Sequence, residues 1–300
     1  MTISTNPDGT CYLIGASGVI GSALYTKLRA AGCRTVGTRN TASGNPELIP
    51  LDLRHDEPAL FARQVCTRDT VYLLAAYSNP SWIHEHRDEA IALNRDGTKR
   101  LIDALRLVQP HLVFMSSVEV FDGVKGAYAE GDAPHPINFY GQLKFEIEQY
   151  LRAGYPRSTI VRTGWNVGTD TASRCVVRLT YETLLKPGAR MAEDNVFSII
   201  DAADTAEGLL RLSGADDVRE IHFAADAPLH RTELARLVQA HSRRGKEMGF
   251  IPCRFADIAY SEPRGRLNDL DNRYSKRRFG IGYRAMEDVV RAKVAILDRT

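Results

Sequence analysis

The first half of the sequence alternates short apolar runs with longer stretches of helical pattern, and this alternation restricts the fold more than any other feature. The apolar runs do not alternate with polar residues, which is typical of parallel strands buried on both faces of a sheet. Six strand–helix units of this kind predict a doubly wound α/β domain. Strands are predicted at residues 10–15, 33–38, 48–51, 70–75, 111–116 and 158–163. Helices are predicted at 19–31, after 55, at 82–108 and at 139–151.

A glycine-rich segment, GASGVIG, lies between the first predicted strand and the first predicted helix. Glycines at this spacing allow a tight turn, close approach of the backbone to a pyrophosphate, and close packing of the helix on the strand. The start of the helix then offers unbonded N–H groups and the positive end of its dipole to phosphates. Glycine triplets are weak evidence alone, but this one lies where a Rossmann dinucleotide site requires it. The residues expected to bind the cofactor here are Gly15, Ser17, Gly18, Val19, Ile20 and Gly21.

The end of the second predicted strand indicates which dinucleotide is bound. NAD enzymes place Asp or Glu there, where it accepts hydrogen bonds from the ribose 2′-hydroxyl. This chain has Arg39 and Asn40 instead. A guanidinium pairs with a 2′-phosphate and stacks on adenine, so NADP(H) is the expected cofactor. The alternative is that Arg39 points to water and the cofactor is NADH.

Composition excludes several other classes of protein. The formal net charge of +2 is too small to indicate a nucleic-acid-binding surface. No apolar stretch is long enough to cross a membrane, and the first ten residues are polar, unlike a secretion signal. The five cysteines are scattered and form no CxxC pair, which favours a reduced cytoplasmic protein without a zinc site. His84 and His86 are two residues apart on a predicted helix and face different ways, so no metal site is expected there either.

Three polar residues in the predicted fold suggest redox catalysis. Tyr140 and Lys144 are four residues apart in a predicted helix and therefore lie on one face of it. A nearby ammonium stabilises a phenolate and so lowers the pKa of a tyrosine that must donate or accept a proton. Ser117 follows the fifth predicted strand, at the carboxyl edge of the sheet where ligands bind in such folds. There its hydroxyl can hold a substrate oxygen near Tyr140.

With these elements in order, the sequence resembles the extended short-chain dehydrogenase/reductases that act on nucleotide sugars. Within them it is most similar to the dTDP-4-dehydrorhamnose reductase group. The resemblance covers nearly the whole chain and is strongest through residue 168. It rests on GASGVIG, on VFDG at 120–123, on PINFYG at 136–141 and on RTGW at 162–165. It implies further cofactor contacts from Asp52, Leu53, Ala75, Ala76 and Asn94, with Tyr140 and Lys144 also touching the cofactor, and a homodimer.

The resemblance is incomplete where the substrate would bind. The reductase group usually has Thr-Asp-Tyr before its VFDG, whereas this chain has Ser117, Val118 and Glu119. Nucleotide-sugar dehydratases carry an Asp-Glu pair at the last two positions, and Val118 removes the Asp that would donate a proton. Glu119 is expected either to contact substrate or to remain a solvated carboxylate. The resemblance also suggests that Trp165 faces the sugar.

The expected organisation is a Rossmann domain followed by a smaller, mostly helical substrate lobe. Residues 1–164 and 196–226 are assigned to the NADP-binding domain, and 165–195 with 227–300 to the lobe. The expected function is hydride transfer from NADPH to a ketone of a small molecule, such as a 4-keto-6-deoxy nucleotide sugar. Two alternatives remain open: an epimerase or dehydratase that retains NAD, and a cofactor-binding regulatory subunit without turnover, since fold alone does not decide activity.

Overall fold

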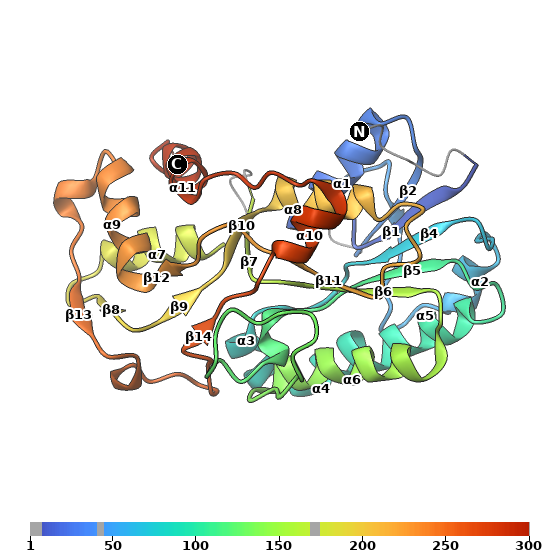
Figure 1. Cartoon of the computed structure of the whole chain (residues 1–300), viewed down its shortest axis with the longest axis horizontal. Helices are drawn as coiled ribbons and strands as arrows, with labels where there is room; N and C mark the ends of the chain where they lie inside the picture. The colour runs from blue at the N-terminus through green and yellow to red at the C-terminus, as the bar shows by residue number, and fades with distance from the viewer. Residues whose placement is uncertain (1–7, 41–44, 169–174, 300) are drawn as a thin grey trace.

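The computed structural model describes residues 8–40, 45–168 and 175–299, and a parallel sheet of seven strands lies at its centre (Figure 1). In chain order the strands are β1 (Thr10–Ile14), β2 (Arg34–Arg39), β3 (Ile49–Pro50), β4 (Thr70–Leu73), β5 (His111–Met115), β6 (Ser158–Thr163) and β11 (Glu220–Phe223). They lie in the order β11-β6-β5-β4-β1-β2-β3, and every neighbouring pair is parallel. The order reverses between β1 and β4, which is the switch point of a doubly wound sheet. The predicted fold class is confirmed.

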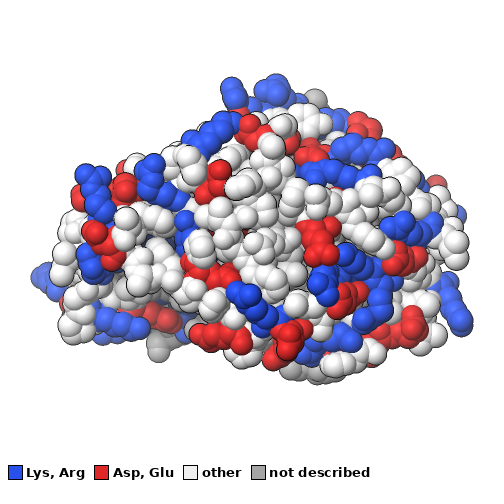
Figure 2. Space-filling model, turned by 90° about the horizontal axis from the view of Figure 1, so that it is seen from below, with Lys and Arg blue, Asp and Glu red and all other residues white. Residues whose placement is uncertain are grey.

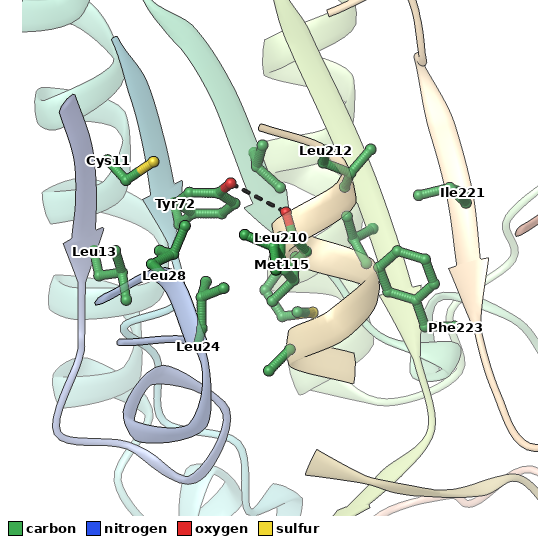
Figure 3. Close-up of a cluster of buried hydrophobic side chains, with 14 of the residues drawn as sticks. Cys11, Leu13, Leu24, Leu28, Tyr72, Met115, Leu210, Leu212, Ile221 and Phe223 are labelled. Carbon is green, nitrogen blue, oxygen red and sulfur yellow. Dashed lines mark hydrogen bonds between the residues drawn. The ribbon is translucent and has the colours of Figure 1, made fainter. Parts of the chain in front are cut away.

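Helices cover both faces of the sheet. Helices α1 (Val19–Ala30) and α8 (Ala202–Arg211) pack on one face, and α2 (Pro58–Ala62), α5 (Thr98–Leu105) and α6 (Phe139–Gly154) on the other. Successive residues of one strand enter opposite cores, as Leu13 and Ile14 do in β1. This explains the unbroken apolar runs of the sequence. Figure 3 shows the core between the sheet and helices α1 and α8, where the Tyr72 hydroxyl donates a 3.0 Å hydrogen bond to the Leu209 carbonyl.

The prediction of one regular helix over 82–108 is wrong. The chain forms α3 (Pro80–Glu85) and α4 (Arg87–Ala90), then a π-helix, η1 (Ile91–Gly97), before α5 begins. His86 separates α3 from α4, with φ −125° and ψ 53°. In the π-helix, a Cβ on Gly97 would lie 2.3 Å from the Leu53 carbonyl oxygen, so the helix touches the loop after β3 directly. Such π segments occur frequently at functional sites.

The C-terminal part of the chain adds a second core beside the sheet. It is built by α7 (Val176–Leu184), α9 (Arg231–His241) and α11 (Met286–Leu297), as the sequence pattern predicts. Short strands join it: β7 (Trp165–Val167) pairs with β10 (Ile199–Asp201), β8 (Arg190–Ala192) with β13 (Ile251–Cys253), and β9 (Val196–Phe197) with both β12 (Leu229–His230) and β14 (Leu267–Asn268). The remaining elements are α10 (Arg273–Phe279), η2 (Val118–Val120), η3 (Gly245–Glu247) and η4 (Phe255–Asp257). The division into two domains remains a prediction; Phe279 and Ile281, assigned to the lobe, pack in the core of the sheet domain.

The surface carries charges of both signs. Figure 2 shows acidic and basic side chains interspersed over the face it presents. Within the part of the chain that the structure describes, no helix is long and apolar enough to cross a membrane. All five cysteines are free.

Candidate active site

The glycine-rich turn lies at the carboxyl end of β1, next to β4. Gly15 has φ +96°, and a Cβ there would lie 2.8 Å from the Ala75 backbone nitrogen. A Cβ on Gly21 would lie 2.2 Å from the Gly15 carbonyl oxygen, so α1 packs directly on the turn. Gly18 begins α1 with extended backbone and without a side-chain cap, and Ser17 beside it is exposed. Val19 and Ile20 follow, half-buried, in the first turn of the helix. The start of α1 therefore presents backbone N–H groups where a pyrophosphate would bind.

The end of β2 lies beside this turn. The Thr38 hydroxyl accepts a 3.1 Å hydrogen bond from the Gly15 N–H, which ties β2 to the turn. Arg39 is half-buried, and its Nε donates to the Leu48 carbonyl at 3.2 Å, while Asn40 is exposed. β2 contains no carboxylate that would repel a 2′-phosphate. This geometry suits a 2′-phosphate better than a bare 2′-hydroxyl.

Asp52 is buried and forms an ion pair with Arg54, a residue that the sequence patterns did not identify. Arg54 Nη2 lies 2.6 Å from Asp52 Oδ2, and this hydrogen bond is the main cause that lowers the pKa of Asp52. Arg54 Nη1 also donates to the Tyr77 hydroxyl at 3.1 Å. Leu53 is buried beside it. The Asp52 carboxylate is thus fixed and charged, with a role toward adenine that remains a prediction.

Asn94 fixes the loop that follows β4. Its side chain is buried in the π-helix, accepts a 2.9 Å hydrogen bond from the Tyr77 N–H and donates a 2.8 Å bond to the Tyr77 carbonyl. Ala75 and Ala76 lead into this clamped residue and are half-buried. The amide therefore holds the backbone of the Ala75–Ala76 segment opposite the glycine turn. Asn94 lies in the π-helix, and the sequence pattern predicted a regular helix here because it does not reveal this distortion.

Ser117, Tyr140 and Lys144 meet at the same edge of the sheet. Ser117 begins η2 directly after β5, and a Cβ on Gly141 would lie 2.0 Å from the Glu119 carbonyl oxygen, so the start of α6 packs on this turn. Lys144 Nζ donates a 2.8 Å hydrogen bond to the Met115 carbonyl at the end of β5. The Nζ atom is 5.9 Å from the centre of the Tyr140 ring. The three side chains are therefore brought together as their positions in the sequence predict.

Burial controls the ionisation of this cluster. It raises the pKa of Tyr140 well above its ordinary value, the negative charge of Glu119 adds to that, and a hydrogen bond with Ser117 opposes it. Burial also lowers the pKa of Lys144 to about 8, with Glu148 acting in the opposite direction. Tyr140 is thus a protonated phenol, able to donate, and Lys144 remains an ammonium up to mildly alkaline pH.

Glu119 is buried rather than a solvated carboxylate, so the second of the two sequence-based alternatives is wrong. Burial raises the pKa of its carboxyl group, and the positive charge of Arg264 opposes this rise. Asn138 Nδ2 donates to Glu119 Oε2 at 2.5 Å, and Asn268 Nδ2 donates to Oε1 at 3.4 Å. Trp165 lies half-buried in β7 and packs against the C-terminal core.

A segment near the C-terminus also contacts the start of α6. Glu262 is buried, and its Oε2 accepts a 3.0 Å hydrogen bond from the Phe139 N–H at the start of α6. Its Oε1 lies 3.1 Å from His84 Nδ1 and 3.2 Å from Arg87 Nη2. A carboxylate at a helix N-terminus stabilises the helix dipole. Sequence patterns could not reveal this contact, because 123 residues separate its two partners.

The fold and the site together define an extended short-chain dehydrogenase/reductase, with a glycine turn at the switch point and a Ser–Tyr–Lys cluster at the carboxyl edge of a parallel sheet. The particular family is shown by the sequence: residues 10–298 match the family described as RmlD substrate binding domain, and the chain belongs to it. The resemblance drawn from the motifs is confirmed.

Proteins with similar sequences differ in how much of this chain they match. The dTDP-4-dehydrorhamnose reductase of Mycobacterium tuberculosis is 29% identical over 72% of this chain and 73% of its own length. That of Sinorhizobium fredii is 37% identical, but over 32% of this chain and 33% of the relative. The methionine adenosyltransferase 2 subunit beta of Bos taurus is 27% identical over 48% of this chain and 42% of the relative. The matches to the latter two thus span less than half of those relatives.

Solved structures share the fold over nearly the whole chain. A dTDP-4-dehydrorhamnose reductase from Clostridium acetobutylicum superposes with a TM-score of 0.81, at 21% identity, over 96% of this chain and 99% of the other. The Bacillus anthracis enzyme of the same name, solved in complex with NADP, gives a TM-score of 0.80 at 19% identity, over 97% and 99% of the two chains. At these identities the likeness concerns the fold.

Proposed function

We propose that this protein is an NADP-dependent oxidoreductase that reduces a ketone, with a 4-keto-6-deoxy nucleotide sugar or a related keto intermediate of sugar or secondary metabolism as substrate. The observation that carries the proposal is the buried cluster of Ser117, Tyr140 and Lys144 at the edge of the sheet that also holds the glycine turn. The reductases among its relatives and an NADP complex among its structural neighbours support it.

The residues present suit NADP(H). The start of α1, which has no side-chain cap, would hold the pyrophosphate, and Arg39 would pair with the 2′-phosphate. Asp52 and Leu53 would contact the cofactor on the adenine side, and Ala75, Ala76 and Asn94 would contact it further along the sheet edge. When bound, NADPH supplies the hydride for the carbonyl carbon.

Side chains of the protein supply the proton and stabilise the charge that its transfer leaves behind. Tyr140 donates the proton of its hydroxyl to the carbonyl oxygen as that oxygen gains negative charge. Lys144, held by the Met115 carbonyl, stabilises the phenolate that remains on Tyr140. Ser117 donates a hydrogen bond that keeps the substrate oxygen next to the phenol. Glu119 and Trp165 contact the substrate, with residues 165–195 and 227–300 serving as the substrate lobe beside the NADP-binding residues 1–164 and 196–226.

A second candidate is supported by the relatives rather than by the site. The match to methionine adenosyltransferase subunit beta favours a cofactor-binding regulatory subunit without turnover. UDP-glucose 4-epimerases that carry NAD or UDP-glucose share the fold at 20% identity, which leaves an NAD-retaining epimerase as a further alternative. Arg39 and Val118 count against the epimerase and the related dehydratase respectively.

Cofactor content tests the proposal directly. Purified protein is denatured, any released nucleotide is identified, and the emptied protein is titrated with NADPH and NADH. Clearly tighter binding of NADPH with little retained nucleotide supports a reductase, after which NADPH oxidation is followed with a panel of keto-sugars. Stoichiometric retained NAD would overturn the role of Arg39, and NADPH binding without turnover would favour the regulatory subunit.

Two further properties are proposed from the family resemblance and the cysteine pattern. A homodimer is expected, and sedimentation at micromolar concentration tests it. A cytoplasmic location is expected from five unpaired thiols, and fractionation tests it.

A further inference from the structure

A buried ion pair lies directly behind the catalytic cluster. Glu148 in α6 and Arg162 in β6 have side chains that are 0% and 1% exposed. Arg162 Nε donates to Glu148 Oε1 at 2.9 Å, and Nη2 donates to Oε2 at 2.7 Å. This is the bidentate geometry in which a guanidinium holds a carboxylate most firmly. Burying such a pair is costly for stability, so its position calls for an explanation.

The pair is connected to the catalytic lysine in two ways. Glu148 follows Lys144 by four residues in α6, so the two side chains share a face of the helix. The Ser116 hydroxyl also donates a 2.6 Å hydrogen bond to Glu148 Oε1. Ser116 follows Met115, whose carbonyl accepts the hydrogen bond from Lys144 Nζ. The carboxylate therefore anchors both the helix and the strand end between which Lys144 is held.

Other charged and titratable groups lie around the Glu148–Arg162 pair. Arg162 also faces Glu220, at 3.4 Å, and His222 Nε2, at 3.3 Å, and its guanidinium lies over the Phe121 ring. Burial lowers the pKa of His222 to about 3, so this ring stays neutral at working pH. The other titratable or charged groups near the network are Arg152, which lies 3.0 Å from Glu148 Oε2, Glu130, whose charge acts on Arg162, and Tyr140.

We propose that Glu148, held by Arg162, is a positioning residue that fixes the Lys144 ammonium and keeps it charged for the proton transfer at Tyr140. The role in turnover rests on the proposed reductase function, while the effect on Lys144 does not. Desolvation favours a neutral Lys144, and the Glu148 charge is the opposing influence. Without that charge, the ammonium should lose its proton at a lower pH and turnover should fail from the alkaline side first.

The test compares two glutamates of the same helix. Glu148→Gln keeps the size of the side chain and an oxygen for Ser116 but removes the charge. Glu146→Gln is the matched control, because Glu146 is 41% exposed and pairs with Lys99 on the surface. The full-length proteins, labelled at the lysine ε-carbon, are titrated by NMR, and the Lys144 signal is the one missing from Lys144→Arg. Turnover, where a keto-sugar is accepted, is followed against pH, and NADPH affinity is measured in parallel.

In Glu148→Gln the Lys144 signal should titrate about one pH unit or more below that of the unsubstituted protein, as expected for loss of an adjacent opposite charge. The alkaline limb of kcat should move by the same amount, with NADPH affinity within about twofold. Glu146→Gln should move neither.

An unchanged Lys144 titration in folded Glu148→Gln overturns the inference. If that variant does not fold, Glu148→Gln with Arg162→Met removes the whole ion pair. Because Glu148 is the charge of this pair that acts on Lys144, the Lys144 signal should then move in the same direction by a smaller amount, and an unmoved signal overturns the inference. Absence of turnover with every keto-sugar refutes the reductase but leaves the NMR result valid.

Discussion

Gly15 offers the sharpest test of how the cofactor turn is built. Its φ of +96° costs an alanine about 1–2 kcal/mol, the price of a left-handed conformation for an L-residue. The added Cβ would also lie 2.8 and 2.9 Å from the nitrogen and Cα of Ala75. Both atoms belong to backbone that cannot rotate away, so the overpacking adds about 1–3 kcal/mol. Gly15→Ala should therefore lower the free energy of unfolding by roughly 2–5 kcal/mol.

Gly32 supplies the matched control. It has φ +75°, yet nothing lies within 4 Å of a Cβ at that position. Gly32→Ala should therefore cost about 1–2 kcal/mol, from the backbone conformation alone. The entropy that alanine removes from the unfolded chain is common to both variants and cancels in the comparison. The difference between them isolates the contact with Ala75.

The assay is urea unfolding of both variants, followed by titration with NADPH. Gly15→Ala should bind NADPH roughly tenfold more weakly or worse, equivalent to losing one charge-assisted hydrogen bond. Gly32→Ala should bind it normally. Equal destabilisation of the two variants, or normal NADPH binding by Gly15→Ala, would refute the idea that Gly15 lets the turn approach β4.

Four further predictions concern the site. Tyr140→Phe should lower kcat by about 10²-fold or more while leaving the NADPH Kd nearly unchanged, and loss of binding instead would mean a structural role. Turnover should fall as the pH rises through about 8, because the lowered pKa of Lys144 means that the ammonium predominates below this pH and is lost above it; a flat kcat between pH 7 and 10 would contradict this. Arg39→Ala should weaken NADPH by about tenfold or more but leave NADH unchanged in competitive titrations, and equal losses for both would disprove a 2′-phosphate contact. Asn94→Ala should destabilise the protein by about 1–3 kcal/mol in urea unfolding, since it removes both hydrogen bonds of the half-buried Tyr77 backbone, and an unaltered midpoint would mean that water replaces the amide.

Local patterns in the sequence predicted the sheet and the position of the glycine turn. The unbroken apolar runs of the strands reflect burial on both faces, which every residue of β4 shows, and the spacing of Gly15 and Gly21 reflects their contact within the turn. The Tyr140–Lys144 pair was equally accessible, because a helix turns both side chains to one side whatever lies around it.

The rest depended on contacts between distant parts of the chain. The π-helix at Asn94 arises where the helix meets the loops after β3 and β4, and its sequence carries no signal of its own. The environment of Glu119 includes Asn268, 149 positions further on, so exposure and burial were indistinguishable in advance. Glu148 could have been found, since it continues the four-residue spacing of Tyr140 and Lys144, but nothing local marks its partner Arg162.

The place of β11 in the sheet has a consequence for how the chain folds during synthesis. This strand pairs with β6, although more than fifty residues intervene. These residues include all of α7 and α8 and the short strands β7, β8, β9 and β10. Until residues 220–223 leave the ribosome, β6 has an open edge, and the core under α8 lacks Ile221 and Phe223. Open apolar edges recruit other strands. Nascent chains that stall or are truncated before β11 should therefore aggregate, whereas those that include α10 should be able to close the sheet.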